Sequence, residues 1–335
     1  MICGSGLDNL ELFFDGHPSV KLLGPVDTPF GMSSDLIVGI VVDNIEVVLL
    51  ARHGQNHAKG PSFVNYRANL FALVKKFRCE AIVSSSTCAA LIGSQINSGD
   101  LCIYHDFMDF TSHGGGIRGP YTFFDGKNNN KMKGIFHAPM NNAFSKDISE
   151  ILANAAQDEG FKVHVEAVCV TVEGPRLPSP SELKMYRTLG ANVADQTTVP
   201  EVILAKELGI PYAVLGMVTD TVDERDSLSY LLEENEALKK NAMHCAPLFV
   251  KTILKAIPSI GALKLKQSKI SKFFYAFCFY DFNVTQIDVQ GNFNGQNEKD
   301  GGEFILFFNC YEINHRKGYS KCRTNVLFFV FFSYN

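Results

Sequence analysis

Residues 190–220, GANVADQTTVPEVILAKELGIPYAVLGMVTD, decide the fold of this chain. Thr198 and Glu201 have the T-x-x-E spacing of a capping box, with Pro200 in the first turn of the apolar segment that follows. This spacing predicts a helix that begins just after Thr198. The apolar run over residues 212–218 then predicts a buried strand.

The start of this helix is a candidate anion site. The first N–H groups of a helix have no partner inside it, and the helix dipole favours negative charge at that end. Thr197 and Thr198 lie there, so they either cap the helix in the ordinary way or bind a phosphate. The next strand runs into Thr219 and Asp220, and open α/β sheets place ligand-binding groups at such strand ends.

Composition restricts the partners of the protein. The 335 residues carry 31 Lys and Arg against 35 Asp and Glu, which argues against a nucleic-acid partner because binding phosphates needs a basic face. Nine cysteines without a C-x-x-C spacing indicate reduced core thiols. The chain has neither a signal-peptide pattern nor an unbroken apolar run of membrane-spanning length, so we expect a cytoplasmic protein with no membrane partner. The first strand would begin at the initiator Met, so we also expect part of the N-terminus to be missing.

Polar groups follow several predicted strands. Apolar runs predict strands over residues 36–42, 47–51, 81–83, 101–104 and 163–172. Arg52 and His53 follow the second strand, Ser86 and Thr87 follow the third, and residues 173–176 follow the last. The guanidinium fork of Arg matches phosphate oxygens, so converging strand ends would suit an anion. On these residues alone, a generic α/β binder of an anionic metabolite stays open.

Helical spacing predicts two further helices, and a loop separates them. The helices cover residues 66–77 and 145–160, and the region 109–133, rich in Gly, Asn and His, is typical of a long functional or mobile loop. No metal-ligand spacing such as H-E-x-x-H occurs, so we expect no metal.

The chain resembles the 5'-methylthioadenosine phosphorylase family, of the trimeric purine nucleoside phosphorylase class, from about residue 2 to 260. The segments that carry the resemblance are GSGLD at 4–8, VDTPFG at 26–31, LLARHGQNH at 49–57, FFDG at 123–126, HAPM at 137–140, VEGPR at 172–176, TTVPEVILAKELGI at 197–210 and MVTD at 217–220. The resemblance implies an α/β fold with a mixed twisted sheet flanked by helices. It also implies phosphate-dependent cleavage of 5'-methylthioadenosine to adenine and 5-methylthioribose 1-phosphate, a step of purine and methionine salvage.

The resemblance implies a role for each site residue. It assigns phosphate binding to Ser5, Arg52, His53, Ser86, Thr87 and Thr197. It assigns the catalytic, purine-facing acid to Asp220, and further substrate contacts to Gln196, Leu177 and His137, the last lent by a neighbouring subunit of a homotrimer. Inorganic phosphate is the co-substrate, and no cofactor is implied. The expected location is the cytoplasm, with a nuclear pool left open.

Three departures from the family pattern leave alternatives open. Gln196 stands where the family has Met under the ribose, Leu177 replaces an aromatic residue beside the base, and Val222 lies where a second acid is expected, or that acid is displaced to Asp223. A purine nucleoside phosphorylase of altered specificity and a catalytically inactive paralogue acting through oligomer contacts are therefore the alternatives.

Residues 261–335 share nothing with the family and form a Phe- and Asn-rich tail without helical or strand periodicity. Such residue types are what translated A/T-rich non-coding DNA yields, so we interpret the tail as intron read-through or a faulty gene model outside a catalytic domain of residues 1–260. A membrane anchor is the rival interpretation, but the run VLFFVFF is too short to span about 30 Å. In the family a C-terminal helix from this region closes over the 5' substituent, so its loss would leave that pocket open.

Overall fold

The computed structural model describes residues 1–5, 7, 10–14, 20–111, 121–125, 135–222 and 228–263, the last range as backbone only up to 244, together with three short strands further on. It divides into two compact units, Met1–Tyr275 and Ala276–Asn335. Parts of the GSGLD and FFDG segments, most of the predicted loop, the displaced acid Asp223 and most of the tail lie outside the described residues.

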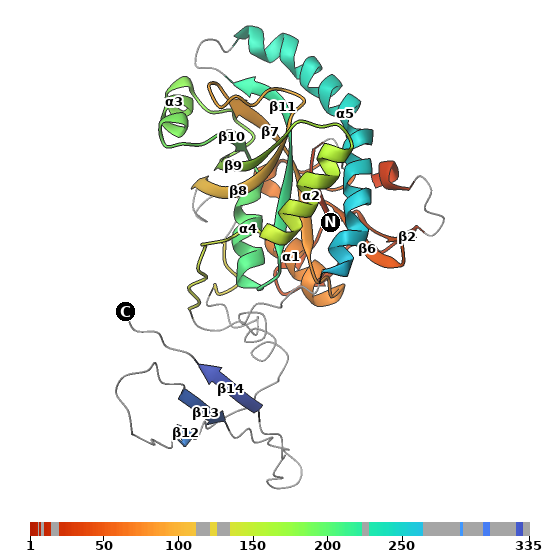
Figure 1. The fold of residues 1–335 in the computed structure, drawn as a ribbon, viewed down its shortest axis with the longest axis vertical. Coiled ribbons are helices and arrows are strands. Elements are labelled where there is room, and N and C mark those ends of the chain that lie inside the picture. Colours follow the sequence, from red (N-terminus) through yellow and green to blue (C-terminus); the bar gives the residue numbers. More distant parts are fainter. Residues whose placement is uncertain are drawn as a thin grey trace. The chain divides into compact units, whose positions relative to one another are not determined.

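Within the described residues of the first unit, a nine-stranded mixed sheet organises the fold (Figure 1). Its strands lie in the order β10-β9-β8-β11-β7-β1-β6-β5-β2. Their bounds are β1 Ile2–Cys3, β2 Lys21–Leu22, β5 Ile37–Val42, β6 Ile45–Ala51, β7 Ile82–Leu91, β8 Leu101–Phe110, β9 Val163–Val172, β10 Val193–Asp195 and β11 Tyr212–Val222. Because β10 also pairs with β7, the strands β7, β11, β8, β9 and β10 close into a ring. The predicted α/β fold with a mixed sheet is confirmed.

The hairpin of β5 and β6 follows directly from its turn residues. Asp43 and Asn44 have φ of 47° and 66°, and Val42 pairs with Ile45 across the turn. Two left-handed residues make the tight turn whose twist matches the flanking strands, and Asp and Asn tolerate that conformation. A separate short hairpin pairs β3, Asp27–Thr28, with β4, Gly31–Met32.

Two central strands continue through residues that were predicted to follow them. β7 includes Ser86 and Thr87, and β11 includes Asp220 after a register irregularity at Val218. The prediction that these polar residues lie beyond strand ends is wrong, because backbone pairing between β7 and β11 holds them in the sheet. β8 likewise extends to Phe110.

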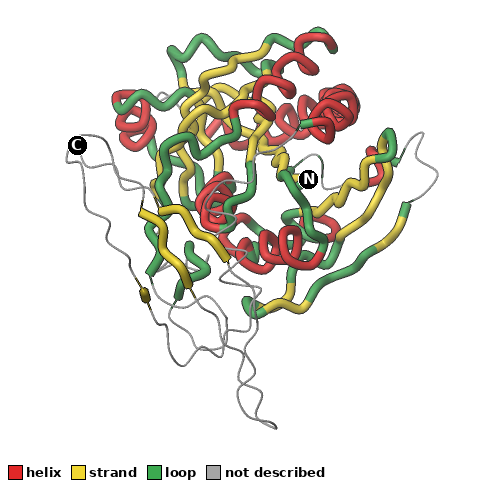
Figure 2. The backbone as a smooth tube through the Cα atoms, turned by 60° about the horizontal axis from the view of Figure 1, so that its bottom comes forward, coloured by secondary structure: helices red, strands yellow, loops and turns green. Residues whose placement is uncertain are grey.

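Helices lie on either side of the strands (Figure 2). Apolar side chains of α2, Lys146–Asp158, and α5, Leu228–Ala262, pack with the short η1 helix, Leu10–Phe13, against one face. α3, Pro180–Thr188, packs over β9 and β10. The remaining helical elements are α1 Tyr66–Phe71, the π turn Ala72–Lys76, α4 Thr198–Glu207, and the 3-10 turns Gln55–His57 and Pro61–Phe63.

The end of α5 is apolar because it is a core element. Its stretch Cys245–Ala262 is long and apolar enough to cross a membrane by length and composition. Within it, buried residues recur every three or four positions and contact the sheet cluster: Ala246, Phe249, Val250, Ile253, Ala256 and Ile257. This spacing is that of a helix with one face on a core. We therefore attribute the apolar stretch to packing.

The second unit contains three strands in its described part. β12, Val289–Gln290, pairs with β13, Phe304–Phe308, which pairs antiparallel with β14, Val326–Val330. These segments form strands although the tail sequence shows no strand periodicity, since Phe and Val favour the pleated conformation. The origin of the tail and the boundary at residue 260 stay predictions.

Candidate active site

A buried ion pair joins the end of β6 to α4. Arg52 directly follows β6 and is 2% exposed. Its Nε donates to Glu201 Oε1 at 2.5 Å, and its Nη2 donates to Glu201 Oε2 at 3.1 Å and to Ser84 Oγ at 2.6 Å. Burial alone would lower the pKa of the guanidinium, but the Glu201 carboxylate outweighs burial and raises that pKa. Arg52 is therefore a permanent cation.

This pair overturns the predicted capping box. Glu201 is fully buried and bound to Arg52, so it does not return to the start of α4. The N-cap residue is Thr197, whose side chain makes no capping bond, and Val199 has non-helical angles of −94° and 130°. The sequence pattern predicted the start of the helix correctly. It could not reveal that the Glu201 carboxylate pairs with Arg52, which follows β6.

The turn after β1 lies against the same guanidinium. A Cβ added to Gly4 would overlap Arg52 Nη1, so only glycine allows this approach. The Gly4 N–H donates to Ser85 Oγ at 2.9 Å, which fixes the turn against β7. Ser5, the next residue, is half-buried. The structure thus brings the ends of β1 and β6 together beside β7, as expected for a shared anion site.

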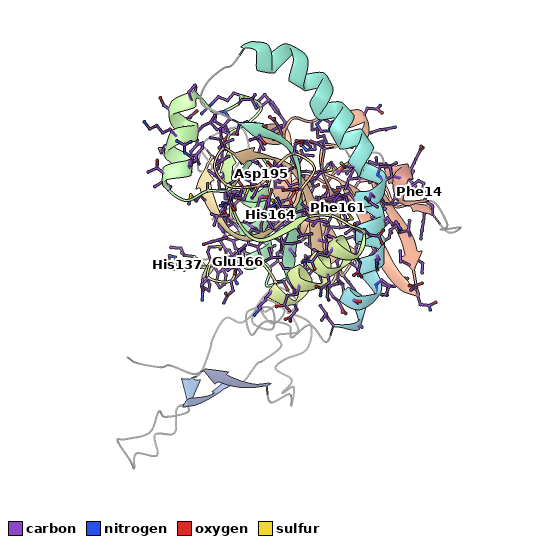
Figure 3. The ribbon with its side chains drawn as sticks, turned by 45° about the horizontal axis from the view of Figure 1, so that its top comes forward. Phe14, His137, Phe161, His164, Glu166 and Asp195 are labelled. Atoms are coloured by element: carbon purple, nitrogen blue, oxygen red, sulfur yellow. The ribbon has the colours of Figure 1, made fainter. Side chains whose placement is uncertain are left out.

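Asp195 is the functional candidate that sequence reasoning missed. This buried carboxylate accepts Ser86 Oγ–H at 2.9 Å, Thr171 Oγ1–H at 2.8 Å, and both the N–H and the hydroxyl of Thr198 at 3.1 and 2.5 Å. It lies among the central side chains in Figure 3. β10 runs antiparallel to β7, so its last residue returns beside Ser86. The sequence did contain a signal for Asp195, because an acidic residue three positions before the first residue of α4 can accept hydrogen bonds from the start of that helix.

The other predicted phosphate ligands differ in their degree of burial. His53 is buried, and its Nδ1 must carry a proton because it lies 2.8 Å from the Lys59 carbonyl oxygen. The His53 ring stacks on His57 with centroids 4.2 Å apart. Thr197 is buried at the start of α4, whereas Thr87 is partly exposed and pairs with Met217 in β11.

Asp220 lies on β11, opposite Ala89 and therefore two positions beyond Thr87 on β7. Burial raises the pKa of its carboxyl group, although the Thr221 N–H donates to Oδ1 at 2.6 Å and works in the opposite direction. Val222 belongs to the apolar cluster under α3, so a second acid at that position would be buried among apolar side chains.

The loop after β9 is held on two sides. Gln196 Nε2 donates to the Arg176 carbonyl oxygen at 2.9 Å, and Ser62 Oγ donates to the Glu173 carboxylate. Arg176 itself makes a bidentate pair with Glu182 at 2.7 and 2.8 Å, so its charge is directed towards α3. The amide of Gln196 thus ties the loop that carries Leu177, whose side chain is 51% exposed.

His137 is not brought to the other site residues within one chain. It is exposed and lies at the edge of the described side chains (Figure 3). Among the residues that the structure describes, no group of three His, Cys, Asp or Glu side chains could hold a metal ion, and Cys88, Cys102 and Cys169 are buried thiols outside any disulfide.

The fold and this arrangement define the class of the protein. A sequence model of the phosphorylase superfamily matches residues 2–255, and the chain belongs to that superfamily. The chain is similar to S-methyl-5'-thioadenosine phosphorylase of Xenopus tropicalis, with 39% identity over 269 residues that cover 78% of this chain and 89% of the relative. The protein of the same name from Anopheles gambiae is 36% identical with the same coverages. The predicted family is confirmed.

A solved structure supports the same relationship. The methylthioadenosine phosphorylase from Schistosoma mansoni in complex with tubercidin superimposes with a TM-score of 0.67 at 31% identity. The match covers 83% of this chain and 95% of the Schistosoma chain. The curated relatives and this structure thus point to one branch of the superfamily.

Proposed function

We propose that the protein is a pentosyltransferase that cleaves 5'-methylthioadenosine with inorganic phosphate to adenine and 5-methylthioribose 1-phosphate. The observation that carries this proposal is the buried Arg52, held charged by Glu201 between the turn after β1 and the hydroxyl-bearing strand β7. The names of the relatives from Xenopus and Anopheles support the substrate.

The phosphate end of the site follows from charge and hydroxyl chemistry. Cleavage of an N-glycosidic bond passes through an oxocarbenium-like state, so an anion held under C1' stabilises it. The proposed ligands are Ser5, Arg52, His53, Ser86, Thr87 and Thr197. Arg52 supplies a buried cation, and its attraction to phosphate acts against the repulsion from its counter-ion Glu201. Phosphate is the co-substrate in this proposal, and the reaction needs no other cofactor.

The base end of the site depends on Asp220. The departing adenine gains a proton at N7 and carries an amino group on the same edge, and a carboxylate accepts from both. The burial that raises the Asp220 pKa lets a larger fraction of this carboxyl group carry the proton that it gives to N7. A 6-oxopurine would place an oxygen against the carboxylate, which favours adenine nucleosides by about 5- to 150-fold.

The remaining substrate contacts lie at the loop after β9 and at the subunit boundary. Gln196 and Leu177 border the nucleoside, and the exposed His137 fits a residue lent to a neighbouring subunit of a homotrimer. We place the protein in the cytoplasm, with no nucleic-acid or membrane partner, which agrees with its net charge of −4.

A single assay tests the proposal. The purified full chain should release adenine from 5'-methylthioadenosine only when phosphate is present, and 5-methylthioribose 1-phosphate should form in equal amount. Release of adenine without phosphate would indicate a hydrolase, and better turnover of inosine would indicate altered specificity. Tight phosphate binding without turnover would identify an inactive paralogue.

A further inference from the structure

The hydrogen bonds around Asp195 determine which acceptor receives the hydroxyl proton of Ser86. A serine hydroxyl has one proton and two lone pairs. Ser86 Oγ lies 2.9 Å from Asp195 Oδ2 and 3.2 Å from its alternative acceptor, the Thr87 carbonyl oxygen. The carboxylate is charged and closer, so it forms the stronger bond. The proton of Ser86 therefore points to Asp195.

A second anion beside Ser86 would compete for that proton. The proposed function puts phosphate against Ser86, and Asp195 is buried, so water cannot replace a lost hydrogen bond. If Ser86 turns its proton to the incoming anion, Asp195 loses a donor. If it does not, a serine lone pair faces the incoming anion. Either arrangement leaves one charged acceptor short of a partner.

A proton carried by the incoming anion resolves this conflict. Hydrogen phosphate has a P–OH group that can donate to the lone pair of Ser86 while Ser86 donates to Asp195. Hydrogen arsenate can do the same. Sulfate has the same charge and a similar shape at neutral pH but carries no proton, so it cannot complete the chain.

We infer that Asp195, acting through Ser86, makes the site selective for oxyanions that carry their own proton, hydrogen phosphate and hydrogen arsenate, over sulfate. The inference rests on the proposed function only in that Ser86 faces the anion. Asp195 does not touch the anion and is a positioning residue. An unpaired charged acceptor of this kind weakens sulfate binding by about 5- to 150-fold relative to phosphate.

Titration calorimetry of the full chain with phosphate, arsenate and sulfate, in a buffer free of other oxyanions, measures this selectivity directly. We expect sulfate to bind at least about fivefold more weakly than phosphate, and arsenate to bind like phosphate. Because all three anions meet the same cations, the ratio of the sulfate and phosphate dissociation constants isolates the contribution of the proton.

Asp195→Asn tests the role of the carboxylate with almost no change in volume. Its amide oxygen can keep the bonds from Thr198, and its nitrogen can donate to Thr171 Oγ1. The neutral oxygen then releases the Ser86 proton to the anion, so the sulfate-to-phosphate ratio should fall towards unity. Thr171→Val is the matched control: it removes a different donor from Asp195, and the ratio should not fall.

Each outcome decides the inference. Equal affinity for sulfate and phosphate in the unmodified protein overturns it, and an unchanged ratio in Asp195→Asn removes Asp195 from the explanation. If that variant does not fold, Ser86→Ala gives the same test, since without the hydroxyl the ratio should also approach unity. Turnover of 5'-methylthioadenosine without selectivity for phosphate over sulfate would support the proposed function and overturn this inference. Selectivity for phosphate without turnover would support this inference and overturn the proposed function. Absence of phosphate binding would overturn both.

Discussion

The guanidinium of Arg52 and the carboxylate of Glu201 form an ion pair, Nε to Oε1 2.5 Å, in which both side chains are 1% exposed. The hydroxyl groups of Ser84 and Tyr212 also donate to Glu201 Oε2, at 2.9 and 2.8 Å. A buried carboxylate is tolerated only when its lone pairs are satisfied in this way. The pair therefore both anchors α4 to β6 and keeps the proposed phosphate ligand charged.

Glu201→Gln should destabilise the fold strongly, because it leaves the buried Arg52 charge without its counter-ion. We expect a loss of about 3 to 5 kcal/mol in the free energy of unfolding, measured by urea denaturation. Glu182→Gln is the matched control, since it removes the carboxylate of an exposed bidentate pair and should cost less than about 1 kcal/mol. Similar losses in the two variants would contradict the argument that burial makes the Arg52–Glu201 pair the more costly one to break.

Asp220→Asn should lower activity and raise thermal stability at neutral pH. Burial raises the folded-state pKa of Asp220, so the stability that its protonated form contributes is present below pH 3.8 and is lost as pH rises through the raised pKa. The neutral amide avoids that loss, so the melting temperature of the variant should exceed that of the unmodified protein at neutral pH but not in acid. The turnover of 5'-methylthioadenosine should fall by about 10² to 10⁴. An unchanged rate would remove Asp220 as the acid.

Leu177→Phe should strengthen nucleoside binding. The Leu177 side chain is 51% exposed on the loop that Gln196 ties to the site, and an aromatic ring there offers the base a stacking surface. Stacking on a base contributes about 1 to 3 kcal/mol, so the KM for 5'-methylthioadenosine should fall about fivefold or more. Leu189→Phe, at a 52% exposed position after α3, is the control and should leave KM unchanged. An unchanged KM for Leu177→Phe would place the loop away from the base.

The ion pair of Arg176 and Glu182 should make the free energy of unfolding depend on pH in the acidic range. The Arg176 guanidinium, followed by the Ser179 N–H, lowers the pKa of Glu182 to about 2. A depressed folded-state pKa means that the contribution is fully present above pH 4.5 and is lost as pH falls through about 2. Melting temperatures of Glu182→Gln and the unmodified protein should therefore differ slightly at neutral pH and converge towards pH 2. A gap that persists there would point to packing of α3 as the cause.

Much of the fold was predictable because local patterns agree with it. The hairpin turn at Asp43 and Asn44, the ten-residue strand Val163–Val172 and the start of α4 all follow from residues close in sequence. Strand ends were less predictable, because pairing between β7 and β11 extends both strands through polar residues. The closing of β10 onto β7 depends on contacts between distant segments and has no local signal.

The residue types of the site were predictable from the sequence. The hydrogen bonds and ion pairs between them were not. The hydroxyls, Arg52 and Asp220 belong to recognisable segments, whereas the partners that set their charge and orientation do not. Glu201 looked like a helix cap, and Asp195 was not distinguished from an ordinary acid before a helix. Both are explained only by side chains that lie far away in the sequence, Arg52 for Glu201 and Ser86 for Asp195.

A shared active site would make His137 and Asp220 act from different subunits. His137 is exposed at the edge of one chain, while Asp220 lies partly buried on β11. Light scattering should therefore give a trimer, and His137→Ala should raise the KM for the nucleoside without changing that mass. His105→Ala, another exposed histidine on β8, is the control and should leave KM unchanged.

Mixing two defective variants tests the sharing directly. His137→Ala and Asp220→Asn chains, unfolded together and refolded, should form mixed trimers in which some sites receive an intact His137 from one chain and an intact Asp220 from its neighbour. Activity of the mixture should then exceed the sum of the two variants refolded separately. If both residues served the same chain, no mixed site could contain the intact pair, and the mixture would only average the two defects.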